Sequence, residues 1–168
     1  MKLEVKNLEK KFKNFTAVKN INFHIDNGQT LGVLGPNGCG KTTTIGMLLG
    51  LIKPSNGKIL IDDENFENLN REKILSQFNF ASPYVELPKK LTVKENLEIY
   101  GRLYGVKDLT RRIQEVSDDL NLSIFLNKKT GELSSGQKNR VSLAKSLINN
   151  SKILFLDEPT ASLDPDIG

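Results

Sequence analysis

The stretch GPNGCGKT at residues 35–42 constrains the fold more than any other part of this sequence. It matches the pattern G-x-x-x-x-G-K-[ST] at every defined position, and this pattern forms a loop that holds the phosphates of a nucleotide. The glycines let the loop curl so that backbone N–H groups face inward toward an anion. The nearly all-apolar segment TLGVLG precedes the loop, and a helical pattern follows it. A complete motif in this strand–loop–helix setting predicts an α/β fold and outweighs a chance glycine-rich turn.

The loop and the helix start after it supply the candidate nucleotide contacts. Lys41 is expected to reach the β- and γ-phosphates, and Thr43 to touch a phosphate oxygen. The Thr42 hydroxyl is a candidate ligand for Mg²⁺. The predicted nucleotide-binding residues of this segment are Gly35, Pro36, Asn37, Gly38, Cys39, Gly40, Lys41, Thr42 and Thr43.

Length and composition fit one ordinary globular domain. The chain has 168 residues, enough for a real core. Its longest apolar run, residues 45–52, is too short to span a bilayer, and the start MKLEVKNL alternates unlike a secretory leader. The single cysteine, Cys39, excludes an internal disulfide and fits a reducing compartment. A net charge of +4 can mark nucleic-acid binding, but no RNP-like aromatic pattern accompanies the early lysines, so we expect no nucleic acid.

Hydrophobic periodicity predicts alternating strands and helices. The predicted strands are 3–8, 20–25, 30–35, 58–61, 78–81 and 152–156. The predicted helices are 41–51, one opened by a capping-box signal at 92–95, one at 108–120 and one that begins near residue 135. Asp-Asn-Gly at 26–28 predicts a hairpin turn into the buried strand at 30–35.

Two acidic residues follow the last predicted strand. A nucleotide-binding loop of this kind works with a carboxylate that holds the metal, commonly at the end of an apolar strand. Asp157 is expected to position Mg²⁺ through its waters, and Glu158 is the candidate general base for the attacking water. Two acids at a strand end are by themselves more often only solvated, so this prediction depends on the phosphate loop.

The segment LSSGQ at 133–137 is a second Ser/Gly turn that opens a helix. Backbone N–H groups and the positive end of the helix dipole favour an anion there. The simpler interpretation is an ordinary N-cap, with Val141, Ala144 and Ile148 in the core. These residues alone leave open why one domain has two turns of this type.

Four segments in order, GPNGCGKTT, LSSGQ, ILFLDEP and ASLDP, closely resemble the nucleotide-binding domain of ATP-binding cassette (ABC) ATPases. The resemblance covers essentially the whole chain, and an LSGGQ-like pentapeptide marks this family among P-loop proteins. It implies an α/β fold in which a P-loop NTPase core carries an N-terminal antiparallel β subdomain and a helical insertion subdomain at about 83–140. It also implies ATP and Mg²⁺ as cofactors, and one ABC ATPase domain over residues 1–168 that is incomplete at its C-terminus.

The same resemblance implies a dimer and so a use for the second turn. In this family two domains associate head to tail, and each ATP lies between the P-loop of one subunit and the LSGGQ motif of the other. The residues that would contact the partner's ATP are Ser134, Ser135, Gly136 and Gln137. The family usually has glycine where this chain has Ser135. Asp164 in ASLDP matches an aspartate that crosses the dimer interface.

Three further positions of the family have no clear single match in this sequence. An early aromatic residue stacks on adenine in this family; Phe12 matches it, with Phe15 as the alternative and a plain core role for either as the simpler interpretation. A glutamine that senses the γ-phosphate normally follows the strand predicted at 78–81, but this chain has Ser82 or Pro83 there. The family's switch histidine lies beyond Gly168, so we expect the encoded protein to continue with another strand.

The leading functional hypothesis is the ATP-hydrolysing subunit of a membrane transporter. Residues 83–109 resemble the helical subdomain of bacterial export-type subunits, on which a membrane partner docks. The expected partners are a second ABC ATPase subunit, identical or different, and an integral-membrane permease, which would place the chain in the cytoplasm on the inner face of the membrane. A soluble ABC ATPase that acts on ribosomes or DNA is the alternative. A module that binds ATP without hydrolysis is a third, against which Glu158 argues.

Overall fold

The computed structural model describes residues 1–82 and 86–157. Predictions that fall on Pro83, Glu158 and Asp164 lie outside the described residues. The chain forms two compact units, Met1–Leu75 and Ser76–Gly168.

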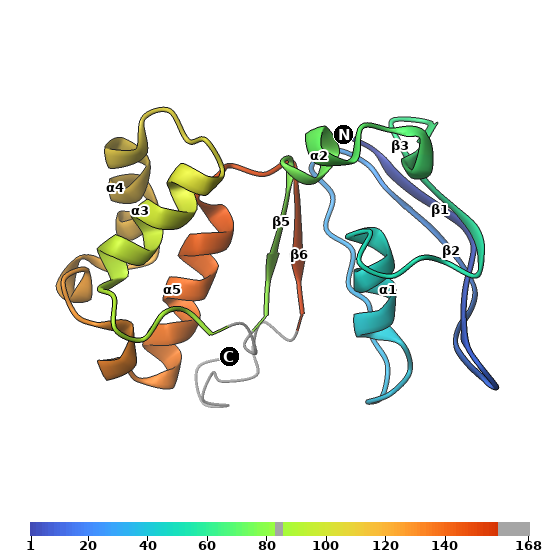
Figure 1. Cartoon of the computed structure of the whole chain (residues 1–168), viewed down its shortest axis with the longest axis horizontal. Helices are drawn as coiled ribbons and strands as arrows, with labels where there is room; N and C mark the ends of the chain where they lie inside the picture. Colours follow the sequence, from blue (N-terminus) through green and yellow to red (C-terminus); the bar gives the residue numbers. More distant parts are fainter. Residues whose placement is uncertain (83–85, 158–168) are drawn as a thin grey trace. The chain divides into compact units, whose positions relative to one another are not determined.

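The first unit is built on a four-stranded antiparallel sheet (Figure 1). Its strands are β1 (Leu3–Phe12), β2 (Phe15–Ile25), β3 (Asn56–Ile61) and β4 (Glu64–Asn65), in the order β2-β1-β3-β4. Alternation along β1 buries Leu3 and Val5, which face Ile61 and Ile59 across the β1–β3 ladder. The N-terminal antiparallel sheet predicted from the sequence is therefore present.

Two predictions for this unit are wrong. Residues 30–35 form no strand, and Leu31, Val33 and Leu34 are exposed, Leu34 at 95%. The turn at 26–28 does form, with Gln29 N–H donating to the Asp26 carbonyl at 3.1 Å, but it leads into no ladder. A strand exists only through its pairing, and in the described residues no strand pairs with this segment. The hairpin is instead β1–β2, closed by Lys13 and Asn14.

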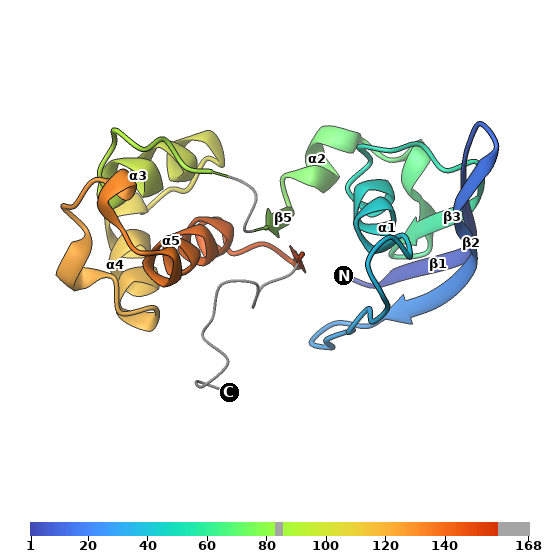
Figure 2. The same ribbon diagram turned by 90° about the horizontal axis from the view of Figure 1, so that it is seen from below.

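The helix α1 (Lys41–Leu48) lies beside this sheet in both views (Figures 1 and 2). It ends three residues earlier than predicted, because Gly50 turns the chain with a φ of 66°. A short 3₁₀ turn, η1 (Phe66–Asn68), and the helix α2 (Arg71–Leu75) complete the unit.

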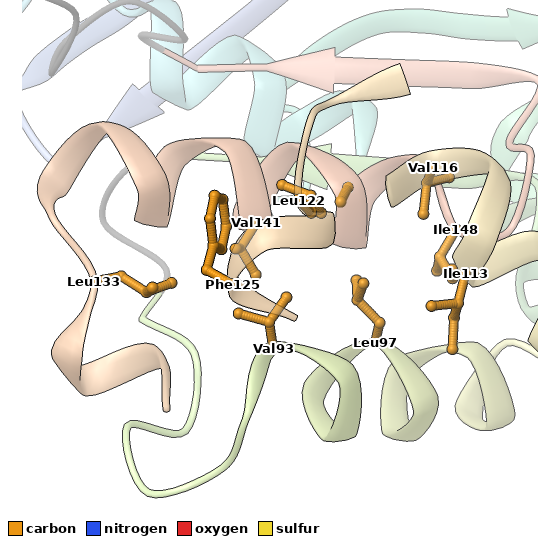
Figure 3. Close-up of a cluster of buried hydrophobic side chains, with 10 residues drawn as sticks. Val93, Leu97, Ile113, Val116, Leu122, Phe125, Leu133, Val141 and Ile148 are labelled. Atoms are coloured by element: carbon orange, nitrogen blue, oxygen red, sulfur yellow. The ribbon is translucent and has the colours of Figure 1, made fainter. Parts of the chain in front are cut away.

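The second unit contains three longer helices, α3 (Val93–Leu103), α4 (Leu109–Asp119) and α5 (Ser135–Leu147), and the 3₁₀ turns η2 (Ser123–Phe125) and η3 (Thr130–Glu132). Their apolar faces meet in one core (Figure 3). This core consists of Val93, Leu97, Ile113, Val116, Leu122, Phe125, Leu133, Val141, Ala144 and Ile148. Each fully buried side chain of this kind stabilises the fold by about 1.5–3 kcal/mol, so packing fixes α5 against α3 and α4.

Two parallel strands, β5 (Phe78–Ala81) and β6 (Ile153–Leu156), run side by side in Figure 1. The three helices form the connection between them, which agrees with the predicted helical insertion in that part of the chain. The ring of Phe78 meets the ring of Phe155 edge-on at 5.5 Å between centroids. The pairing brings the carboxyl ends of β5 and β6 together, since parallel strands end at the same edge.

Candidate nucleotide-binding site

Lys41, the first residue of α1, is held against the loop that precedes it. Its Nζ donates to the carbonyl oxygens of Gly35 at 2.7 Å and Pro36 at 3.1 Å. The Cys39 N–H donates to the same Pro36 carbonyl at 3.3 Å and closes a turn inside the loop. The loop therefore keeps a positive charge beside the start of a helix, where a phosphate group binds well.

Position 40 accepts only glycine. Its φ is 96°, in the left-handed region, and a Cβ there would lie 2.4 Å from the carbonyl oxygen of Ala17 in β2. The backbone of β2 thus packs directly on the loop and fixes where α1 begins. Side chains cap the N-termini of α3, α4 and α5, but α1 begins at Gly40 without one. Such a start suits a helix whose N-terminal N–H groups bind an anion.

Phe12 and Phe15 face each other across the β1–β2 hairpin. Both are exposed, at 45% and 61%, and so both present an aromatic face to a ligand. The Lys10 ammonium lies 4.9 Å from the centroid of the Phe12 ring, which orients that ring. The choice between the two as the adenine-stacking residue stays a prediction, with Phe12 preferred.

Ser134 and Gln137 form a reciprocal capping box at the start of α5. The Gln137 N–H donates to Ser134 Oγ at 3.3 Å, and the Ser134 N–H donates to Gln137 Oε1 at 3.0 Å. Both residues therefore have a structural role in addition to the predicted contact with ATP. Ser135 and Gly136 follow in the first turn, and an added Cβ on Gly136 would meet no heavy atom within 4 Å. The SSGQ turn is thus a preformed and accessible helix N-terminus.

Asp157 follows β6 directly and is buried, with 6% of its surface exposed. Its backbone N–H donates to the Ala81 carbonyl at 2.9 Å, which extends the β5–β6 ladder by one residue. Ser82, where the family has its sensor glutamine, follows β5 and is also buried. The structure therefore brings Asp157 and Ser82 to the same end of the two strands.

The predicted metal ligands fit Mg²⁺ by their chemistry. Thr42 and Asp157 offer hydroxyl and carboxylate oxygens, and Mg²⁺ prefers few protein oxygen ligands together with water and substrate phosphates. Within residues 1–82 and 86–157, no three His, Cys, Asp or Glu side chains cluster as a protein-only metal site. Thr42 belongs to the first unit and Asp157 to the second, and their joint role in holding Mg²⁺ stays a prediction.

The sequence did not point to Lys145, a buried lysine on α5. It lies one helical turn after Val141 on a face that packs in the unit's interior. The available signal was this spacing, since a lysine at i+4 from a core valine falls on the apolar side of the helix.

The chain matches a family model described as ABC transporter over residues 18–161. It is 38% identical to the SkfA peptide export ATP-binding protein SkfE of Bacillus subtilis, over 96% of this chain and 67% of that protein. It is 36% identical to the Nod factor export ATP-binding protein I of Burkholderia lata, over 97% of this chain and 54% of that protein.

Solved structures agree with these matches. The dimeric structure of a bacterial ABC transporter cassette superposes with a TM-score of 0.84 at 30% identity, over 98% of this chain and 77% of that chain. A related dimeric structure in a post-hydrolysis state, bound to ADP and Pi, gives a TM-score of 0.83 at 30% identity, over 98% of this chain and 77% of that chain.

The fold and the loop define a P-loop NTPase of mixed α/β architecture. The chain belongs to the ABC transporter family, as an ATP-binding cassette. It spans between 28% and 67% of the length of the curated relatives that it matches. Among the helices within 1–82 and 86–157, none is both long and apolar enough to cross a membrane.

Proposed function

We propose that this chain binds and hydrolyses ATP to power transport of a substrate across a membrane. The observation that carries the proposal is the glycine-formed loop at Gly35–Lys41, whose lysine lies against its own backbone beside a helix N-terminus. Family membership supports the same function, because relatives of both import and export type are named ATP-binding proteins. The transported substrate would be chosen by a membrane partner.

Different residues of the chain are proposed to bind the nucleotide, hold the metal and accept a proton. Lys41 and the N–H groups of residues 35–43 bind and orient the β- and γ-phosphates, and Phe12 stacks on adenine. Thr42 and Asp157 hold Mg²⁺, which would supply a positive charge for the developing charge on the phosphoryl oxygens. Glu158, one residue after Asp157, accepts the proton of the attacking water.

Hydrolysis is proposed to take place in a head-to-tail dimer. The SSGQ turn, Ser134–Gln137, would contact the γ-phosphate of ATP bound to the partner, and Asp164 would cross the interface. A helix N-terminus that is capped internally and open in front suits this role, since it needs no rearrangement to receive an anion. Two solved structures of related cassettes are dimers, which supports a dimer for this chain.

A permease is the proposed second partner, and the helical subdomain at about 83–140 is the proposed docking part. This unit contains a cavity of about 110 Å³ between residues 86–89, Thr130 and α5. Leu87 and Val141 give it an apolar floor, and Glu86, Lys89 and Lys138 surround it with charge. A recess of this size, lined by both apolar and charged residues, is suited to a single side chain that projects from a helix of the partner. Docking there would hold the chain on the inner face of a membrane.

Release of phosphate from ATP by the purified full-length protein tests the proposed function. The wild type should hydrolyse ATP only with Mg²⁺, and Glu158→Gln should bind ATP normally but lose at least about a hundredfold in turnover, the usual scale for a general base. Asp119→Asn, which neutralises an exposed carboxylate at the end of α4, is the matched control and should keep full activity. Mg²⁺-dependent hydrolysis that survives Glu158→Gln would remove Glu158 from the reaction, and absence of hydrolysis in the wild type would refute the proposal.

A further inference from the structure

Lys145 on α5 places its ammonium group at the end of β5. Only 9% of its surface is exposed. Its Nζ lies 3.4 Å from the carbonyl oxygen of Phe80, to which it donates, and 5.1 Å from the centroid of the Tyr100 ring on α3. Three elements, α3, α5 and β5, therefore meet around one positive charge.

This charge has no carboxylate partner within 4 Å in the part of the chain that the structure describes. Burial accordingly lowers the pKa of Lys145 from its usual 10.5. A buried charge without an ion pair costs stability, and an apolar side chain of similar length would avoid that cost. The contact with Phe80 is therefore not explained by stability alone.

The end of β5 connects Lys145 to the proposed metal carboxylate by two successive backbone groups. Lys145 holds the carbonyl of Phe80, and the carbonyl of the next residue, Ala81, accepts the backbone N–H of Asp157 at 2.9 Å. A shift of the Phe80–Ala81 peptide would therefore move Asp157 as well. The buried Ser82 follows on the same strand end and would move with it.

The helix that carries Lys145 is itself fixed on both sides. Arg112 on α4 donates to the carbonyls of Leu147 at 2.7 Å and Ile148 at 3.3 Å, just after Lys145. On the side of the strand, Asn79 Nδ2 donates to Asn149 Oδ1 at 2.9 Å. The ammonium group is thus presented from a helix whose C-terminal end is held by hydrogen bonds from both α4 and β5.

We propose that Lys145 is a positioning residue for Asp157. Its ammonium group fixes the Phe80–Ala81 peptide at the end of β5, and the next peptide, Ala81–Ser82, whose carbonyl accepts the Asp157 N–H, in turn sets the position of Asp157. The inference rests on the proposed function only in that Asp157 holds Mg²⁺; the contact itself does not depend on it. Removal of the charge should make the end of β5 more mobile and lower the apparent affinity for Mg²⁺. It should leave the binding of ATP by the phosphate loop unchanged.

The test compares Lys145→Met, which keeps length and burial, with Lys145→Arg, which keeps charge and donors, in the full-length protein. The matched control is Lys128→Met, an exposed lysine of the same unit. Hydrogen exchange of the Asp157 N–H should be at least about tenfold faster in Lys145→Met, while that of Leu97 in the core stays unchanged. In the ATPase assay, the Mg²⁺ concentration for half-maximal activity should rise about tenfold, as for loss of a group that orients a metal ligand, with KM for ATP within about twofold. Lys145→Arg should restore both values.

Unchanged exchange at Asp157 in Lys145→Met would overturn the proposal. So would faster exchange throughout α3 and α5, which would make Lys145 a general stability residue, or a Lys145→Arg protein as impaired as Lys145→Met. If Lys145→Met yields no folded protein, Lys145→Gln takes its place with the same expectations. A wild type that hydrolyses no ATP would refute the proposed function, whereas the exchange measurement would still decide the role of Lys145 at the strand end.

Discussion

Cys39 is an exposed thiol within the phosphate loop, between Gly38 and Gly40. Its backbone N–H already bonds to the Pro36 carbonyl, so its position in the loop is defined. A bulky group on its sulfur would occupy the space that the proposed function gives to phosphate. Alkylation with N-ethylmaleimide should therefore abolish ATP binding, and Mg-ATP should protect the thiol from the reagent.

Mass spectrometry of the modified peptide, with and without Mg-ATP, measures this protection. Cys39→Ser, treated in the same way, controls for effects of the reagent elsewhere and should keep its ATP binding. A modification rate that is equal in both conditions would contradict the placement of nucleotide at this loop.

Lys145 should also give the protein a distinct dependence of stability on pH. Burial lowers its pKa in the folded chain below 10.5, its value when unfolded. Between these two pKa values the unfolded chain holds a proton that the folded chain has released, so the free energy of unfolding rises with pH in this window. Lys145→Met lacks this contribution. Wild type should therefore gain stability relative to the variant as pH increases toward 10.5, as urea unfolding at a series of pH values would show.

Tyr104 titrates in the same alkaline range, and burial raises its pKa. Its contribution has the opposite sign, because the unfolded chain loses the phenol proton first and stability falls as pH rises. Both proteins contain Tyr104, so its effect cancels in their difference. A difference in stability that stays constant with pH would show that Lys145 has the same pKa in the folded and the unfolded chain.

At the scale of the element, α3 and α5 both begin with a capping box, but only the turn at the start of α5 is proposed to contact ATP. Thr92 and Glu95 form the capping box of α3, and Ser134 and Gln137 form that of α5. Thr92→Ala and Ser134→Ala should each lower the free energy of unfolding by about 1 kcal/mol, the usual effect of losing an N-cap. Only Ser134→Ala should also reduce ATP hydrolysis, because only that turn is proposed to touch the partner's γ-phosphate.

Chemical denaturation and phosphate release, measured on both variants, separate these two effects. Thr92→Ala is the matched control for the loss of a cap. Equal losses of activity in the two variants would mean that Ser134 acts through helix stability alone.

Elements whose own pattern defines their buried face could be predicted from the sequence. Amphipathic spacing and capping residues identify α3, α4 and α5 within a few residues, and β6 follows from its apolar run. The strand predicted at 30–35 is wrong, because an apolar run does not show whether another strand is present for it to pair with. The β1–β2 hairpin was missed, since its turn at Lys13 and Asn14 contains no glycine and a stronger signal stands at 26–28.

The candidate site shows the same division. Residues within contiguous motifs, such as Lys41 and Asp157, could be named from the sequence because spacing along the chain carries their chemistry. For Lys145, the spacing from Val141 indicates the buried side of α5, but its contact could not be named, because its partner, the Phe80 carbonyl, is 65 residues away along the chain. Every residue has a backbone carbonyl, so the type of the residue at position 80 does not indicate that its carbonyl accepts this hydrogen bond.

At the scale of the whole molecule, bound ATP should stabilise a dimer of two copies of this chain. Each nucleotide would remain half bound until the SSGQ turn of a partner covers it, and slow hydrolysis would prolong that state. Glu158→Gln should therefore form a stable dimer with Mg-ATP but not with Mg-ADP, as light scattering after size-exclusion chromatography would measure. The double variant with Lys41→Ala is the control and should stay monomeric. A Glu158→Gln protein that binds ATP as a monomer would refute the shared site.

The boundary at Leu75 separates most of the residues proposed to bind the nucleotide from the candidate general base and the SSGQ turn. Phe12 and the phosphate loop lie in Met1–Leu75, whereas the SSGQ turn and both candidate carboxylates lie in Ser76–Gly168. The affinity for ATP and the rate of its hydrolysis would then be determined mainly by residues that two different segments of the gene encode. Recombination near this boundary between related cassettes would exchange one property and keep the other, so a family of transporters could retune its speed while every member continues to respond to the same level of cellular ATP.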